Sequence, residues 1–143
     1  MVTNVVIPQA QSAVNQTILS SAARTSSDTA GPWIVDYYSS AEITVAVTTC
    51  SGTLNVYVQK LLADNATYGD IASFSQYTTA TFTTSGTKTL NFVNGGNTLI
   101  TETDAALTAN TVLTTNFGQK WRVKYVFGTN GAATFAVYGS FFK

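Results

Sequence analysis

The feature that most constrains the fold is a two-residue alternation of apolar and polar side chains, which recurs along much of the chain. In residues 53–60, Leu54, Val56 and Val58 alternate with Thr53, Asn55, Tyr57 and Gln59. Successive side chains of a β-strand point to opposite faces, so this alternation predicts half-buried strands with the second set facing outward. One core is expected to bury Leu54, Val56, Val58, Trp121, Val123, Phe135 and Val137.

Turn signals divide the chain into short strands. Further strands are expected at 33–38, 42–48, 71–77, around Phe82, at 90–92, and in a closing hairpin whose turn is 128–131. Residues 96–118 form the least regular stretch, with short strands expected at 99–100 and 112–113 and a helical turn within 103–110. Strands at this spacing with little helix signal predict an all-β fold, an antiparallel β-sandwich resembling a jelly roll.

The first thirty residues differ in composition from the rest. They are rich in Ser, Thr, Ala, Gln and Asn, with one apolar cluster, Val2, Val5, Val6 and Ile7, near the start. We therefore expect an extended N-terminal arm over 1–30 and a sandwich domain over 31–143. The cluster predicts an arm that binds a neighbouring subunit or another protein, and the alternative is a loose terminus.

The charge content narrows the classes of partner. Charged residues make up 10% of the chain, and seven basic and seven acidic residues give a formal net charge of +0. Such a surface favours neither nucleic acid nor anionic membrane as a partner. The first residues lack the pattern of a signal peptide, and no apolar run has the roughly 20 residues of a membrane helix. The single cysteine, Cys50, fits assembly in a reducing cytoplasm.

The residue types needed for common catalytic sites are scarce. There is no histidine, which excludes Ser-His-Asp and Cys-His nucleophilic catalysis. Most of the seven acids fall in expected turns; Glu102 and Asp104 form a weak candidate Ca²⁺ site, for which solvated loop carboxylates are the favoured alternative. We therefore expect a protein that is not an enzyme and needs no cofactor.

Two groups of side chains are candidates for partner binding. Lys120, Arg122 and Lys124 form a basic stripe on one strand face, suited to an acidic protein surface or a sugar, or simply to solvent. A second group consists of aromatic rings that stack on sugars if they are exposed and otherwise fill the core or an interface. These rings belong to Trp33, Tyr37, Tyr38, Tyr57, Tyr68 and Tyr77.

Several motifs resemble, in order and spacing, a family of small bacteriophage virion proteins. They are Gly-Thr-Leu-Asn-Val-Tyr-Val-Gln at 52–59, Asp-Ile-Ala-Ser-Phe-Ser-Gln at 70–76, Trp-Arg-Val-Lys-Tyr-Val at 121–126 and Thr-Phe-Ala-Val at 134–137. Upstream, Ser-Ser-Ala-Ala-Arg-Thr at 20–25 is similar to the family's opening segment. The resemblance covers residues 20–142, and the long 96–118 stretch departs from it.

This resemblance implies a jelly-roll virion protein without catalytic residues. We expect a capsid decoration (cement) protein, made in the host cytoplasm and located on the capsid surface. Its expected partners are the major capsid protein, bridged and stabilised by each subunit, and further copies of itself in a homotrimer. The alternatives are a tail or fibre component, or a sugar-binding module on the virion surface.

Overall fold

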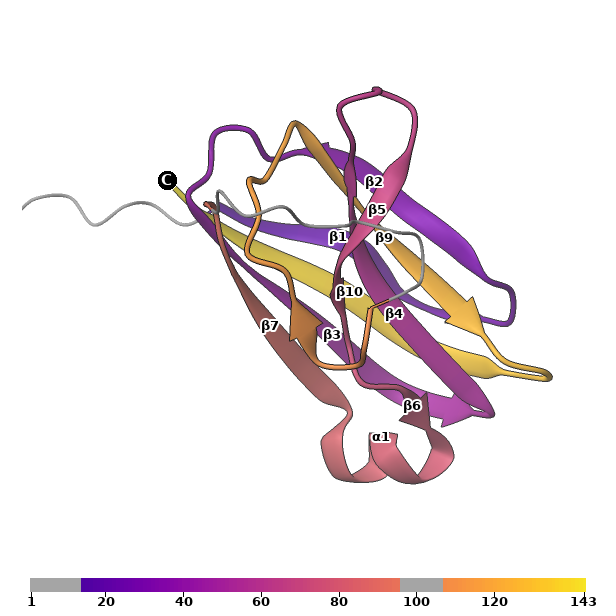
Figure 1. The fold of residues 1–143 in the computed structure, drawn as a ribbon. Helices are drawn as coiled ribbons and strands as arrows, with labels where there is room; N and C mark the ends of the chain where they lie inside the picture. Colours follow the sequence, from indigo (N-terminus) through magenta and orange to yellow (C-terminus); the bar gives the residue numbers. More distant parts are fainter. Residues whose placement is uncertain (1–13, 96–106) are drawn as a thin grey trace, which may run out of the picture.

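A computed structural model describes residues 14–95 and 107–143, which form two packed antiparallel sheets (Figure 1). The first sheet has four strands in the order β1 (Val14–Arg24), β10 (Ala132–Phe142), β3 (Ser40–Ser51) and β7 (Thr87–Val93). The second has the order β2 (Asp28–Ile34), β9 (Lys120–Phe127), β4 (Thr53–Leu61), β5 (Tyr68–Ser73) and β8 (Thr111–Val112). A short β6 (Tyr77–Thr78) pairs with β4 and leads into the helix α1 (Thr79–Ser85).

The strand order confirms the predicted all-β sandwich and gives it jelly-roll connectivity. Strands β1 to β4 alternate between the two sheets, and β9 and β10 then return to lie beside β2 and β1. Two antiparallel Greek keys folded over each other produce this order. The alternating side chains explain the layers, because each sheet needs one apolar face to cover the other.

The core lies between the sheets, where the alternation predicted it. All seven residues expected to share it are fully buried. Trp121 is at its centre: its ring centroid lies 4.5 Å from that of Phe117 and 5.0 Å from that of Phe92. The indole N–H of Trp121 donates to the carbonyl of Phe117 over 2.8 Å, so the largest fully buried side chain also has a hydrogen-bond acceptor.

The predicted arm is wrong for residues 14–30, because β1 and the first three residues of β2 lie in this segment. β1 pairs with β10 from Val14 opposite Phe141 to Arg24 opposite Ala133, and β2 pairs with β9. Most β1 side chains are exposed, so the strand lacks the apolar alternation that identifies a buried one. Its position comes from backbone pairing at the sheet edge. Residues 1–13, with the apolar cluster at 2–7, lie outside the described residues.

Local predictions also needed correction between 71 and 85. The strand expected over 71–77 ends at Ser73, and Phe82 lies in α1 rather than in a strand. Thr78 caps this helix, since its hydroxyl accepts from the N–H of Thr81 while the hydroxyl of Thr81 accepts from the N–H of Thr78. The strand expected at 112–113 is present as β8, one residue earlier. The strand expected at 99–100 lies outside the described residues, as does the first half of the helical turn expected within 103–110; no helix is present at 107–110.

Candidate functional site

The predicted basic stripe lies on the outer face of the second sheet. Lys120, Arg122 and Lys124 are half-buried and alternate along β9 with buried core residues. Arg122 makes contacts within the chain: its Nε donates to Oε1 of Gln59 over 2.7 Å, and its guanidinium lies 4.0 Å from the ring centroid of Tyr68. The stripe therefore exists as a geometric feature, and its binding to a partner stays a prediction.

Beneath Arg122 lies a buried polar network that the sequence did not reveal. Gln59 points to the outer face as predicted, since it is paired with Arg122 in the β4–β9 register, yet its exposed fraction is 0%. Its Nε2 donates to Oδ1 of Asp70 over 2.7 Å, and Asp70 is also fully buried. A cation, an amide and a carboxylate in series join β9, β4 and β5, so the network fixes the register of three strands.

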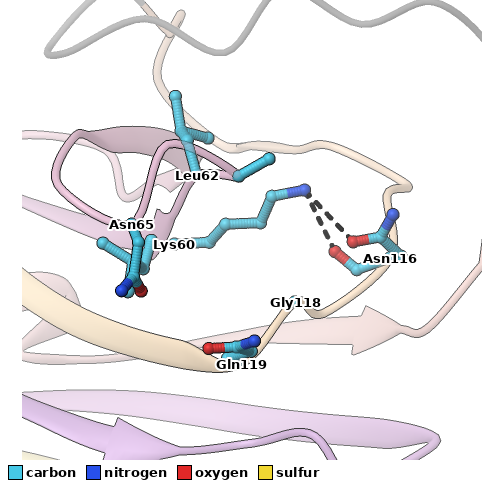
Figure 2. Close-up of a pocket in the computed structure, with 8 residues that line it drawn as sticks. Lys60, Leu62, Asn65, Asn116, Gly118 and Gln119 are labelled. Carbon is cyan, nitrogen blue, oxygen red and sulfur yellow. Dashed lines mark hydrogen bonds between the residues drawn. The ribbon is translucent and has the colours of Figure 1, made fainter.

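A cavity of about 450 Å³ opens at one end of the second sheet, between the β4–β5 turn and the chain that leads into β9 (Figure 2). Lys60 extends along it, and its Nζ donates to Oγ1 of Thr115 over 3.0 Å and to the backbone oxygen of Asn116 over 3.2 Å. The amides of Asn65, Asn116 and Gln119 line the cavity with Leu62. Such a lining can exchange hydrogen bonds with uncharged polar groups, and the described residues that line the cavity include no carboxylate for acid–base chemistry.

The turn beside this cavity is fixed by Asp64. Its carboxylate accepts from the hydroxyl of Thr67 and from the backbone N–H groups of Thr67 (2.9 Å) and Ala66 (3.0 Å). These hydrogen bonds, the Thr67 hydroxyl first, hold the pKa of Asp64 below its ordinary value. Asp64 therefore has a structural explanation as a turn residue, as expected for most acids of this chain.

A second cavity, of about 350 Å³, lies where α1 meets the end of the first sheet, and its wall is mainly small and apolar. Ala23, Cys50, Phe82 and Ala133 contribute to it. Burial raises the pKa of the Cys50 thiol, which therefore stays protonated and is a poor nucleophile. Cys50 therefore lies in the cavity wall with a thiol that is not activated as a nucleophile.

Arg24 closes this end of the sandwich and gives the motif at 20–25 a structural meaning. β1 shifts register against β10 between Leu19 and Ala22. The guanidinium of Arg24 donates to the carbonyls of Ser20 (2.8 Å), Ala22 (3.0 Å) and Phe135 (3.0 Å), and lies 5.0 Å from the ring centroid of Phe135. Arg24 therefore provides hydrogen bonds to carbonyls at the irregular part of β1 and covers the core residue Phe135.

The predicted aromatic candidates differ in exposure, and Tyr38, Tyr57 and Tyr68 are half-buried. Trp33 and Tyr77 belong to the core and are not available to a ligand, whereas Tyr37 is 70% exposed in the loop after β2. Tyr138, which was not among the predicted candidates, is 44% exposed on the outer face of β10. A shallow depression of about 240 Å³ there is lined by Tyr138 with neighbours that include Asn15 and Ser140.

The remaining candidates have no assigned site. Glu102, Asp104 and the apolar cluster Val2, Val5, Val6 and Ile7 lie outside the described residues. In residues 14–95 and 107–143, no three His, Cys, Asp or Glu side chains come together as metal ligands. Over the same residues, no helix has the length and apolar character needed to span a membrane.

Neither a protein-family model nor a curated protein matches the chain.

Proposed function

We propose that this chain is a non-enzymatic structural protein of a bacteriophage particle, a decoration protein that binds the major capsid protein on the capsid surface. The observation that carries the proposal is the outer face of the first sheet, which is polar but almost without charge. Residues that are paired across β1, β10, β3 and β7 form two rows on this face. The rows are Asn15–Ser140–Glu42–Asn91 and Thr17–Tyr138–Thr44–Thr89.

The chemistry of this face suits burial against another protein. Glu42 is the one charged residue in those rows. Several hydroxyls and amides already bond to each other, as Thr44 does with Thr89 (2.8 Å) and Ser140 with Asn15 (2.7 Å). Short neutral side chains lose less rotamer entropy on burial than Lys or Glu, and charged residues are depleted at interface cores. The face can therefore be covered without burying many unpaired charges.

The fold is compatible with this role. Jelly rolls occur in viral capsid domains and in lectins, so the fold supports both the first proposal and its alternative. In the proposed assembly, subunits form a homotrimer, and each subunit adds buried area between neighbouring shell proteins. Binding to the assembled shell shifts the equilibrium between the shell and its separated subunits toward the assembled shell.

Copy number in the particle tests this proposal. Particles of the phage that encodes the chain are purified and the chain is quantified against the major capsid protein. A decoration protein is expected in numbers comparable with the shell protein, whereas a tail or fibre component is present at a small fraction of it. Absence from purified particles would reject the virion role altogether.

A pair of variants tests whether the first-sheet face is the contact. Thr89→Lys places a charge on that face, and Thr83→Lys places the same charge at an exposed position of α1. Thr89→Lys is expected to weaken binding to undecorated shells while Thr83→Lys leaves it unchanged, because only the first buries a charge. Equal binding by both variants would show that this face is not used.

A sugar-binding module is the second candidate, and Tyr138 favours it. A partly exposed ring bordered by amides and hydroxyls is the arrangement that stacks on a sugar and bonds its hydroxyls. Tyr138→Ala is expected to abolish glycan binding in an array assay if this function is correct, with the exposed Tyr37→Ala as the control. Failure of the wild-type chain to bind any glycan would eliminate this candidate.

A further inference from the structure

The open edges of the two sheets differ in how well they are protected against an added strand. In the described part of the chain, the edge strands are β1 and β7 in the first sheet and β2 and β8 in the second. β1 has two shifts in register, β2 contains Pro32 and one shift, and β8 has two residues. Irregular, proline-containing and short edges pair poorly with a further strand. β7 has seven residues, contains no proline and pairs with β3 without a shift, so it is the edge best suited to accept one.

The hydrogen bonds at the two ends of β7 show which of its backbone groups face this open edge. At one end, the N–H of Val47 donates to the carbonyl of Gly86 over 2.6 Å. At the other end, the N–H of Asn94 donates to the carbonyl of Ser39 over 2.7 Å. Bonded and non-bonded pairs alternate along an antiparallel ladder, so the residues bonded to β3 between these ends are Lys88, Leu90 and Phe92. The backbone groups of the intervening residues point away from β3; these edge-facing residues are Thr87, Thr89, Asn91 and Val93.

Two further observations agree with this assignment. The hydroxyls of Thr44 and Thr89 lie 2.8 Å apart, and side chains approach each other most closely across non-bonded pairs. Within residues 14–95 and 107–143, the backbone hydrogen bonds outside the strand ladders and the helix involve none of the edge-facing residues. The side chains of these residues are exposed. Their N–H and C=O groups are therefore accessible to an added strand.

We propose that an extended segment of the major capsid protein pairs with the edge of β7 and adds a fifth strand to the first sheet. Through Asn91 and Thr89, β7 completes both rows of the face that is proposed to contact the shell, so a protein lying on that face borders this edge. Main-chain hydrogen bonds along an edge provide affinity, and alternate side-chain positions provide specificity. The inference rests on the proposed function for the identity of the partner, and it adds the backbone groups that bind it.

The side chains of β7 indicate the sequence that the added segment should have. Leu90 and Phe92 pack toward the core, so the residues beside them in the segment should be apolar. The outward row of β7 is exposed and uncharged, so the alternate residues of the segment should be uncharged as well. The ammonium of Lys88 is held within the subunit, because it donates to Oγ of Ser75 over 2.7 Å and lies 3.9 Å from the ring centroid of Tyr77. The expected partner segment is therefore an uncharged strand with a two-residue alternation.

A proline substitution separates the edge-facing groups from the rest of the fold. The N–H of Asn91 is not used in the β3–β7 ladder, so Asn91→Pro should leave the sandwich folded while it removes one edge donor and places a ring at the edge. The matched control is Asn91→Ala, which removes the same side chain and keeps the N–H. Asn91→Pro should bind undecorated shells about tenfold more weakly than Asn91→Ala, or weaker still. Equal binding by the two folded variants would overturn the proposed pairing.

Amide hydrogen exchange tests the same edge without a substitution, should Asn91→Pro fail to fold. In the wild-type chain alone, the amides of Lys88, Leu90 and Phe92 should exchange slowly because they are bonded to β3. Those of the edge-facing residues should exchange fast and become protected on undecorated shells, as read by NMR after the chain is released. Edge amides that are protected in the dilute chain, or that stay unprotected on shells, would overturn the proposal. Protection that appears in the chain alone as its concentration rises would assign the edge to a second copy and would also overturn it.

These outcomes are separable from those of the proposed function. If Asn91→Pro and Asn91→Ala bind shells equally well, only the strand pairing is wrong. If the wild-type chain neither binds shells nor occurs in particles, the virion role is rejected, and the capsid protein is rejected with it as the occupant of this edge.

Discussion

Replacing Arg24 with methionine tests the interpretation of the irregular end of β1. Methionine keeps an apolar stem over Phe135 and removes the guanidinium that donates to three carbonyls. The carbonyls of Ser20 and Ala22 belong to exposed hydrogen bonds, so water replaces the lost donor at little cost. The hydrogen bond to the Phe135 carbonyl is part-buried, and leaving that acceptor unsatisfied costs about 1–3 kcal/mol. Loss of the cation–π contact adds about 0.5–1 kcal/mol.

Arg24→Met should therefore lower the free energy of unfolding by about 2 kcal/mol, measured by urea denaturation with an unchanged m-value. Lys120→Met, which removes a half-buried cation from β9, is the control and should change stability by less than about 0.5 kcal/mol. If Arg24→Met is as stable as this control, the arginine does not support the strand and our account of the motif at 20–25 is wrong.

Three further predictions follow from the core and the cavity in Figure 2. Trp121→Ala should cost roughly 3–5 kcal/mol in urea denaturation, and a cost below about 1 kcal/mol would refute its central place. Lys60→Met should speed hydrogen exchange around Asn116, whose backbone oxygen it binds; unchanged exchange would contradict that anchoring. Burial raises the pKa of Tyr77, so above its ordinary value of 10.0 the unfolded chain ionises first and stability should fall by up to about 1.4 kcal/mol per pH unit. Tyr77→Phe should reduce this dependence of stability on pH, and an unchanged dependence would refute ionisation of Tyr77 as its cause.

The core could be predicted from the sequence because alternation and burial coincide in the strands that form its centre. Val56, Val123 and Phe135 each lie between two polar or small neighbours, and such a pattern has one buried face in any sandwich. The prediction of a strand around Phe82 was wrong because a single aromatic residue does not define a periodic pattern. The Thr78–Thr81 capping box was the available signal for a helix there, although its Thr-x-x-Thr form lacks the usual Glu or Gln.

The candidate sites were less predictable because they depend on pairings distant in sequence. Gln59 reads as an exposed strand residue until β5 and β9 bring Asp70 and Arg122 against it. The sequence around Arg24 does not indicate that its guanidinium binds three carbonyls, because this contact depends on how β1 pairs with β10. The depression beside Tyr138 depends on β1 as well as β10, so the sequence around Tyr138 does not indicate it.

The pairing of β1 with β10 also determines how the molecule responds to mechanical load. Force applied between residues before Val14 and residues after Phe142 acts at one end of this pair and opens its hydrogen bonds one after another, as a zipper opens. A load applied instead between Val14 and Ala133 acts at opposite ends of the pair. It then lies parallel to the strand and is shared by the whole β1–β10 ladder at once. The same pair would thus be weak when peeled and strong in shear.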